Sequence, residues 1–233
     1  VIIFLVGRAH KKGKSKDYKL YEEQNFMVLK NFMIQLKKKD LLPKKFIFAS
    51  TISVYGEQMN VSHYDETYNP KPKTPYAVTK LIAEEYLLDN YSEITWILRF
   101  APVYSLDFQL NIDSRVKIAS FYFRVGDGSH KLSLCNIKNI LEVVIGIIDG
   151  KIPNGLYNIS DSKQYNYKDL LEYKKSSYVF IIPKLFVKIF YYLGNLLKNN
   201  YLIENSIKLL SNNEYPNYRI KSFIDLPHKI KDV

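Results

Sequence analysis

The sequence predicts an α/β fold built on a parallel β-sheet, and two observations support this. Three continuous apolar runs, VIIFLVG, KKFIFAS and TWILRF, follow one another along the first half of the chain. Segments whose apolar residues recur at helical spacing separate them. Strands that are apolar at nearly every position are typical of sheets covered on both faces. The alternation of strand and helix favours parallel strands joined by right-handed crossovers.

Each element of this first half has its own signal. Gly7 ends the first run, and Pro75 stands just before the second helix, where proline favours a first turn. The basic stretch RAHKKGKSKD, which contains His10, predicts a loop after the first strand. In chain order, we expect a strand at 1–7, a helix at 18–39, a strand at 44–50, a helix at 76–90 and a strand at 95–100.

The pattern changes after Pro102. Residues 137–148 have helical spacing, GLYNIS reads as a short strand, and helical patterns dominate residues 168–210. No internal repeat or low-complexity linker separates the two halves. We therefore expect a sheet region over residues 1–105 and, over residues 106–233, mainly a small lobe attached to it.

Composition narrows the functional classes. A chain of 233 residues with 47% hydrophobic residues is large enough to bury one sizeable core. No run of about 18 uncharged apolar residues exists, so no transmembrane helix is expected. Pro183, Lys184 and Lys188 interrupt the segment YVFIIPKLFVKIFYYLG, which is predicted to pack on the core or the lobe rather than on a membrane surface. The single Cys135 excludes an internal disulfide framework and favours a reducing, cytoplasmic location.

The formal net charge of +11 raises the question of nucleic-acid binding. The lysines are scattered along the chain, as expected for solvated faces, and no nucleic-acid motif accompanies them. A basic surface also suits an anionic small-molecule substrate. The scattered His and Asp residues lack metal-ligand spacing, so no metal site is predicted.

The stretch STISVYGEQMNVSHYDETYNPKPKTPYAVTK places reactive groups near one another. Ser50, Thr51 and Ser53 lie at the carboxyl end of a predicted strand, where open α/β sheets bind ligands. Tyr76 and Lys80 are one helical turn apart and share a face. A phenol beside an ammonium suits proton transfer at a carbinol, although an unperturbed phenolate costs about 4 kcal/mol at pH 7. The spacing alone is weak, because chance predicts about three tyrosines followed in this way by a basic residue.

The wider context is more specific. STISVYGE followed by PYAVTK resembles the extended short-chain dehydrogenase/reductases, and more closely the NAD-dependent sugar-nucleotide epimerase/dehydratase family. Further segments resemble that family in the same order along the chain: VIIFLVGRAH, YEEQN, ILRFAPVY, GDGSHKLSLCNIKNI and GLYNISD. The resemblance implies a partial Rossmann-like parallel sheet at 1–105, forming the C-terminal part of an NAD-binding domain, with a substrate-binding lobe after it.

The resemblance also implies roles for individual residues. The implied ligands are NAD and a nucleoside-diphosphate sugar, and a homodimer formed by the helices at 21–39 and 76–90 is implied as well. Tyr76 would be the general acid/base, Lys80 would lower its pKa and hold the nicotinamide ribose, and Thr51 would hydrogen-bond the reacting sugar oxygen. The implied cofactor-binding residues are Gly7, Ser50, Tyr76, Lys80, Pro102 and Val103; the implied substrate-binding residues are Thr51, Ser53 and Lys131.

The sequence departs from the family at several positions. It contains no Gly-rich G-x-x-G-x-x-G turn, which in the family binds the cofactor pyrophosphate. If VIIFLVG is the family's fourth strand, the chain is expected to be a fragment that lacks roughly 60 residues or more, to expose that strand at the sheet edge and to bind NAD weakly. Asn139 stands where the family usually has Asp, Lys131 stands near the place of a diphosphate-binding arginine, and Pro102 replaces an asparagine loop.

Three functions remain open on these grounds. The first is epimerisation at C4 of a nucleotide sugar, by transient oxidation, for polysaccharide precursors. The second is reduction of a nucleotide sugar. A 4,6-dehydratase is disfavoured, because Ile52 and Ser53 stand where dehydratases of the family place an Asp-Glu pair. The third is a non-catalytic remnant or binding module.

Overall fold

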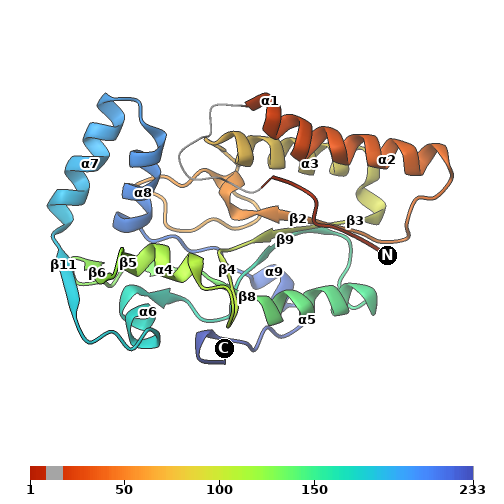
Figure 1. The fold of residues 1–233 in the computed structure, drawn as a ribbon. Coiled ribbons are helices and arrows are strands. Elements are labelled where there is room, and N and C mark those ends of the chain that lie inside the picture. The colour runs from red at the N-terminus through yellow and green to blue at the C-terminus, as the bar shows by residue number, and fades with distance from the viewer. Residues whose placement is uncertain (9–17, 233) are drawn as a thin grey trace.

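The main element of the fold is a four-stranded parallel sheet with the strand order β1-β2-β3-β9 (Figure 1). The computed structural model describes residues 1–8 and 18–232, and His10 lies outside this range. The strands are β1 (Ile2–Phe4), β2 (Phe46–Thr51), β3 (Thr95–Phe100) and β9 (Gly155–Ile159). This arrangement confirms the α/β class and the parallel sheet.

Both faces of the sheet are covered, which explains the continuous apolar runs. Phe46 and Phe48 of β2 lie in one core cluster, together with residues of α2 (Val28–Lys38) and α3 (Pro75–Tyr91). Ile47, between them, lies in the cluster on the other face, with residues of α5 (Ile137–Ile148). Since neighbouring strand residues point to opposite faces, Phe46, Ile47 and Phe48 are all buried, which accounts for the continuous apolar run of β2.

The helix predicted at 18–39 has an interruption. It begins as α1 (Tyr18–Tyr21), continues as a π-helical turn at Glu22–Met27 and ends as α2. The turn carries Asn25, which is fully buried. Its Nδ2 donates to Thr79 Oγ1 at 3.2 Å, and its Oδ1 accepts from the amide of Arg8 at 2.5 Å. Asn25 therefore joins the segment after β1 to α3.

The remainder of the chain forms small sheets and short helices around the carboxyl end of the main sheet. Strand β4 (Val103–Tyr104) pairs with β8 (Cys135–Asn136), β10 (Tyr165–Asn166) with β7 (Lys131–Leu132), and β6 (Phe121–Val125) with both β5 (Lys117–Ile118) and β11 (Val179–Ile182). The helices are α4 (Leu110–Val116), α6 (Tyr167–Tyr173), α7 (Lys184–Leu196), α8 (Asn200–Leu210) and α9 (Tyr218–Lys221). Short 3₁₀ turns occupy Ile52–Tyr55, Ser92–Ile94 and Ile230–Asp232. Strand β9 lies beyond residue 105 and yet belongs to the main sheet. The boundary between the sheet region and the lobe at residue 105 stays a prediction.

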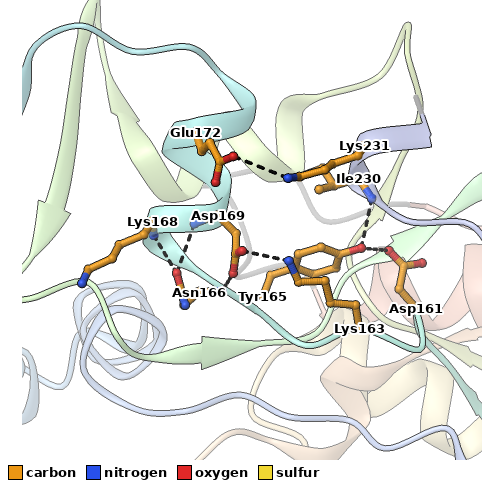
Figure 2. Close-up of polar contacts among 9 residues, drawn as sticks. All are labelled: Asp161, Lys163, Tyr165, Asn166, Lys168, Asp169, Glu172, Ile230 and Lys231. Carbon is orange, nitrogen blue, oxygen red and sulfur yellow. Dashed lines mark hydrogen bonds and ion pairs between the residues drawn. The ribbon is translucent and has the colours of Figure 1, made fainter.

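A buried carboxylate connects the end of β9 to the C-terminal segment. Asp161 accepts hydrogen bonds from the hydroxyls of Tyr104 and Tyr165 at 2.6 and 2.8 Å, and from Asn139 Nδ2 at 2.8 Å. The Tyr165 hydroxyl also accepts from the amide of Ile230 at 3.0 Å (Figure 2). Burial raises the pKa of Asp161, and these hydrogen bonds oppose the rise. Asn139, at the position where the family usually has Asp, is thus a structural partner of Asp161.

Helix α7 packs on the lobe, as predicted, but through one face only: Val187 lies in a core cluster with Phe123 and Val125, and Gly194 lies against α8. Only Val187 and Gly194 of this helix are buried, and its other apolar side chains are largely exposed. No helix among the described residues is long and apolar enough to cross a membrane.

Candidate functional site

A cavity of about 740 Å³ lies at the carboxyl ends of β2 and β3. Its walls come from these strand ends, the start of α3, helix α4 and helix α8. Six of the residues that the sequence singled out line it: Ser50, Thr51, Ser53, Tyr76, Pro102 and Val103. A volume of this size is typical of small-molecule sites, which range over about 300–1,000 Å³.

The chain reverses sharply after Thr51. The Thr51 hydroxyl accepts a hydrogen bond from the amide of Ser53 at 3.2 Å and caps the 3₁₀ turn that follows. Gly56 ends this turn with φ of +63°, and a Cβ there would lie 1.7 Å from the carbonyl oxygen of Lys71. Glycine is therefore required at this position. The tight turn fixes the hydroxyls of Thr51 and Ser53 at the cavity wall.

The loop that follows is held down on the sheet. Tyr55 donates its hydroxyl proton to Asn158 Oδ1 at 2.7 Å, and Asn158 Nδ2 donates to the carbonyl oxygen of Tyr64 at 2.8 Å. The amide of Lys71 donates to the carbonyl oxygen of Tyr55 at 3.2 Å. One side chain of β9 thus anchors both ends of the segment from Tyr55 to Tyr64, and this segment includes the cavity residues Gly56 and Glu57.

Tyr76 lies in the first turn of α3. Thr74 caps that helix by accepting a hydrogen bond from the amide of Ala77 at 3.3 Å. Burial raises the pKa of Tyr76, while a hydrogen bond with the Thr51 side chain lowers it. The structure therefore brings the predicted acid/base and the predicted sugar-contacting hydroxyl into direct interaction at the cavity.

Lys80 has a different environment. Its Nζ donates to the carbonyl oxygen of Ala49 at 2.8 Å and lies 4.5 Å from the centroid of the Phe48 ring. Burial lowers the pKa of Lys80 to about 8, and the charge of Glu84 acts in the opposite direction. Lys80 is not among the residues that line the cavity. Its ammonium lies beneath the site, against the backbone of β2.

Two further predicted cofactor residues lie near Lys80. A Cβ at Gly7 would be 3.5 Å from Lys80 Nζ and 3.1 Å from Asn25 Oδ1, so Gly7 passes close to this ammonium. Ser50 lines the cavity, but its hydroxyl donates to Glu84 in the buried layer. Gly7, Ser50 and Lys80 therefore gather at the carboxyl ends of β1 and β2.

Lys131 lies apart from these residues. It is exposed on β7, its amide donates to Asn212 Oδ1 at 2.9 Å, and it is not part of the cavity lining.

The cavity also contains charged residues that the sequence analysis did not single out: Glu57, Lys73, Arg115, Glu204 and Lys208. Arg115 is only 8% exposed, and its Nη1 is buried without a hydrogen-bond partner among the described residues. Burial raises the pKa of Tyr167, whereas the nearby Arg115 lowers it. Burial likewise raises the pKa of Glu204, and Lys208 opposes this. These residues come from distant segments, so no local pattern marked them.

Comparisons with known proteins agree with this geometry. The chain matches the family model for the NAD dependent epimerase/dehydratase family over residues 1–159. None of the curated protein sequences matches it.

Solved structures of sugar-nucleotide epimerases are similar in fold. A UDP-glucuronic acid 4-epimerase from Bacillus cereus in complex with NAD is 24% identical, with a TM-score of 0.57 over 77% of this chain and 61% of that one. A UDP-glucose 4-epimerase from Thermotoga maritima is 22% identical, with a TM-score of 0.61 over 78% of this chain and 63% of that one. For the ADP-L-glycero-D-manno-heptose-6-epimerase of Helicobacter pylori, the identity is 16% and the TM-score 0.67, over 97% of this chain and 68% of that one.

The chain thus spans less than two thirds of the length of the first two structures. At these identities the structural similarity shows the fold, while the family model covers most of the chain. The protein chain belongs to the NAD-dependent epimerase/dehydratase family, and NAD is the cofactor of that family.

Proposed function

We propose that the protein containing this chain epimerises a nucleoside-diphosphate sugar at C4, with Tyr76 as the general acid/base. The observation that carries this proposal is the interaction of Tyr76 with Thr51 at the wall of the cavity. Thr51 ends β2, and Tyr76 faces the same cavity from the first turn of α3, at the edge of the sheet where ligands bind in open α/β folds. Family membership adds the chemical context.

In this proposal, the Tyr76 phenolate accepts the proton of the sugar C4 hydroxyl and later returns it. The Thr51 hydroxyl holds the same sugar oxygen and so fixes its distance to the phenol. Because burial raises the pKa of Tyr76, the phenolate needs a nearby positive charge. Lys80 supplies that charge once its ammonium leaves the carbonyl oxygen of Ala49 and contacts the ligand instead.

The described residues fit the nicotinamide end of the cofactor. Gly7 passes close to the buried ammonium of Lys80 at the carboxyl ends of the strands, where ligands bind in open α/β sheets, and this supports the assignment. We assign Gly7, Ser50, Tyr76, Lys80, Pro102 and Val103 to this part of the cofactor. When bound there, NAD would supply the hydride acceptor for oxidation of the sugar carbon and the hydride donor for its reduction.

Arg115 is our candidate for the diphosphate of the substrate. It lines the cavity, is nearly buried and has an unpaired Nη1, and guanidinium groups suit phosphate oxygens. Lys73 and Lys208 add positive charge to the same lining. The predicted substrate residue Lys131 lies outside this lining, whereas Ser53 is within it.

A nucleotide-sugar reductase is the second candidate, because the same residues would protonate a keto sugar. A non-catalytic remnant is the third, since the sequence has no Gly-rich phosphate turn. Ile52 and Ser53 have no carboxyl group for the elimination step of a dehydratase. We also infer a cytoplasmic location, because the single Cys135 favours a reducing compartment, and a role in the synthesis of polysaccharide precursors.

Incubation of the protein with a panel of nucleotide sugars, in parallel reactions with NAD and with NADH, tests the proposal, with products identified by NMR. Epimerisation predicts interconversion of C4 epimers without net formation of NADH. Stoichiometric consumption of NADH would instead identify a reductase, and a 4-keto-6-deoxy product a dehydratase. Absence of turnover with every sugar would favour the remnant.

A further inference from the structure

Helix α7 carries an exposed apolar stripe. The side chains of the stripe are between 41% and 78% exposed, although all are large and apolar. They are Leu185, Phe186, Ile189, Phe190, Leu193, Leu196 and Leu197. Single exposed apolar residues are ordinary, but a contiguous set on one element indicates an interaction surface.

The spacing of these residues places them on one face of the helix. They recur at intervals of three and four residues, which is the repeat of an α-helix. Val187 and Gly194 lie on another face and are buried. At Gly194 a Cβ would be 3.0 Å from side-chain atoms of Leu202 and Ile203, so α8 packs closely there. The stripe is therefore left on the outside, at the end of the molecule far from α2 (Figure 1).

The chain segment that carries the stripe has charged residues of one sign only. Between Glu172 and Glu204 the chain contains no acidic residue and five lysines: Lys174, Lys175, Lys184, Lys188 and Lys198. Lys184 forms an ion pair with Asp127 at 3.5 Å. Lys188 and Lys198 are exposed, one within α7 and one just after it.

Exposed tyrosines flank the same helix. Tyr178 before it is 86% exposed, Tyr192 within it 68%, and Tyr201 after it 50%. Tyrosine has an apolar ring and a polar hydroxyl, and it is enriched where hydrocarbon meets water.

We propose that the stripe of α7 docks the protein onto the surface of an anionic lipid bilayer, with the helix lying in the plane of the membrane. An apolar face, lysines beside it and aromatic residues at its borders are the features of interfacial helices. The apolar side chains enter the acyl boundary, while the ammonium groups of Lys188 and Lys198 meet anionic headgroups. This inference does not depend on the proposed catalytic function.

The lysines favour a bilayer over a second copy of this chain. A two-fold pairing of two stripes would bring each copy's α7 against the same helix of the other copy. Lys188 and Lys198 of both copies would then add positive charge along the same seam, with no acidic residue between Glu172 and Glu204 to compensate it. An anionic membrane supplies both the apolar medium and the negative charge.

Flotation with lipid vesicles tests the proposal on the purified chain. The probes are vesicles of phosphatidylcholine alone and vesicles with one quarter phosphatidylglycerol, at roughly physiological salt. We expect binding to the anionic vesicles. The double variant Phe186→Gln with Phe190→Gln should weaken it by more than about tenfold, because two exposed rings no longer enter the bilayer. Lys188→Gln and Lys198→Gln should each weaken it by about fivefold.

Leu141→Gln with Ile145→Gln is the matched control. These side chains are also an exposed apolar pair one turn apart, 56% and 51% exposed, on α5. This control should bind vesicles like the wild type. Circular dichroism checks that each variant is folded, and the lysine variants test the proposal even if the Phe double variant does not fold.

Three outcomes would overturn the proposal: no binding of the wild type to anionic vesicles, binding that survives Phe186→Gln with Phe190→Gln, and equal loss in the α5 control. Sedimentation analysis adds a fourth. A dimer that the Phe double variant converts to a monomer would show that a second copy occupies the stripe.

Discussion

Glu84 and Arg99 form a bidentate ion pair beneath the candidate site. Arg99 Nε lies 3.1 Å from each carboxylate oxygen of Glu84, and Nη2 lies 2.6 Å from Oε2. Both side chains are almost fully buried. The pair joins α3 to β3, and Glu84 also accepts the hydroxyl proton of Ser50. The position of α3 relative to the sheet therefore depends on this pair.

Glu84→Gln should lower the free energy of unfolding by about 3–5 kcal/mol, because it leaves the Arg99 charge buried without its partner. Chemical denaturation measures the change. Glu85→Gln is the matched control, since Glu85 is the exposed neighbour on the same helix and should change stability by less than about 0.5 kcal/mol. Equal stability of the two variants would show that the pair contributes little.

Tyr76→Phe should reduce turnover by about 10²–10⁴-fold, because it removes the group that transfers the proton. Nucleotide-sugar binding should be nearly unchanged, since only one hydroxyl is lost. The exposed Tyr218, replaced by Phe, provides a control for tyrosine substitution. Retention of more than about a third of the turnover by Tyr76→Phe would exclude Tyr76 as the acid/base.

The buried Lys80 should make stability depend on pH above neutrality. Burial lowers its pKa to about 8 in the folded protein, while the unfolded chain keeps the ordinary value of 10.5. Between these values the unfolded state binds more protons, so this group makes the protein more stable as pH rises from about 8 to 10.5. Below about 8 its unfavourable contribution is fully present.

Lys80→Met removes this titration and keeps most of the side-chain volume. We expect the variant to be more stable than the wild type near pH 7, and the difference to shrink towards pH 10. Thermal unfolding of both proteins across this range measures it. A difference that stays constant with pH would mean that the Lys80 pKa is not lowered.

Arg115→Gln should weaken binding of a nucleoside diphosphate by roughly tenfold, because charge-assisted hydrogen bonds contribute about 1.5–3 kcal/mol. Calorimetric titration with UDP and ADP measures this without cofactor or turnover. Lys131→Gln tests the residue indicated by the sequence in the same assay, and we expect a smaller loss there. A larger loss of affinity for Lys131→Gln than for Arg115→Gln would show that Lys131, and not Arg115, binds the diphosphate.

The family resemblance predicts a homodimer formed by α2 and α3. Val28, Phe32 and Leu88 are exposed apolar residues on these helices, whereas the neighbouring Leu87 is buried in the core. Phe32→Glu should dissociate the dimer, and solution scattering at micromolar concentration should detect this. A wild-type protein that is only monomeric would exclude the dimer.

The sequence predicted the parts of the fold that depend on local patterns. The apolar runs around Phe46 and Ile97 identified strands because the sheet is buried on both sides. Thr51 and Tyr76 were found because a strand end and a helix start are visible in the sequence. Arg115 and Glu204 were missed, since only the packing of α4 and α8 brings them to one cavity. The apolar character of α7 predicted packing on the lobe, which Val187 and Gly194 provide. The sequence spacing alone did not reveal that the opposite face remains exposed.

The side chain of Asn158 ties the irregular segment between Tyr55 and Tyr64 to the sheet, and this should protect the segment from local opening. Amide protons in a surface loop usually exchange with solvent quickly, because small local openings suffice. Here the Tyr64 amide is bonded to the carbonyl oxygen of Glu214 at 3.0 Å, and Tyr64 itself is held by Asn158 on β9. Its deuterium uptake should therefore be as slow as that of strand amides, and Asn158→Ala should accelerate it without a comparable change in β2.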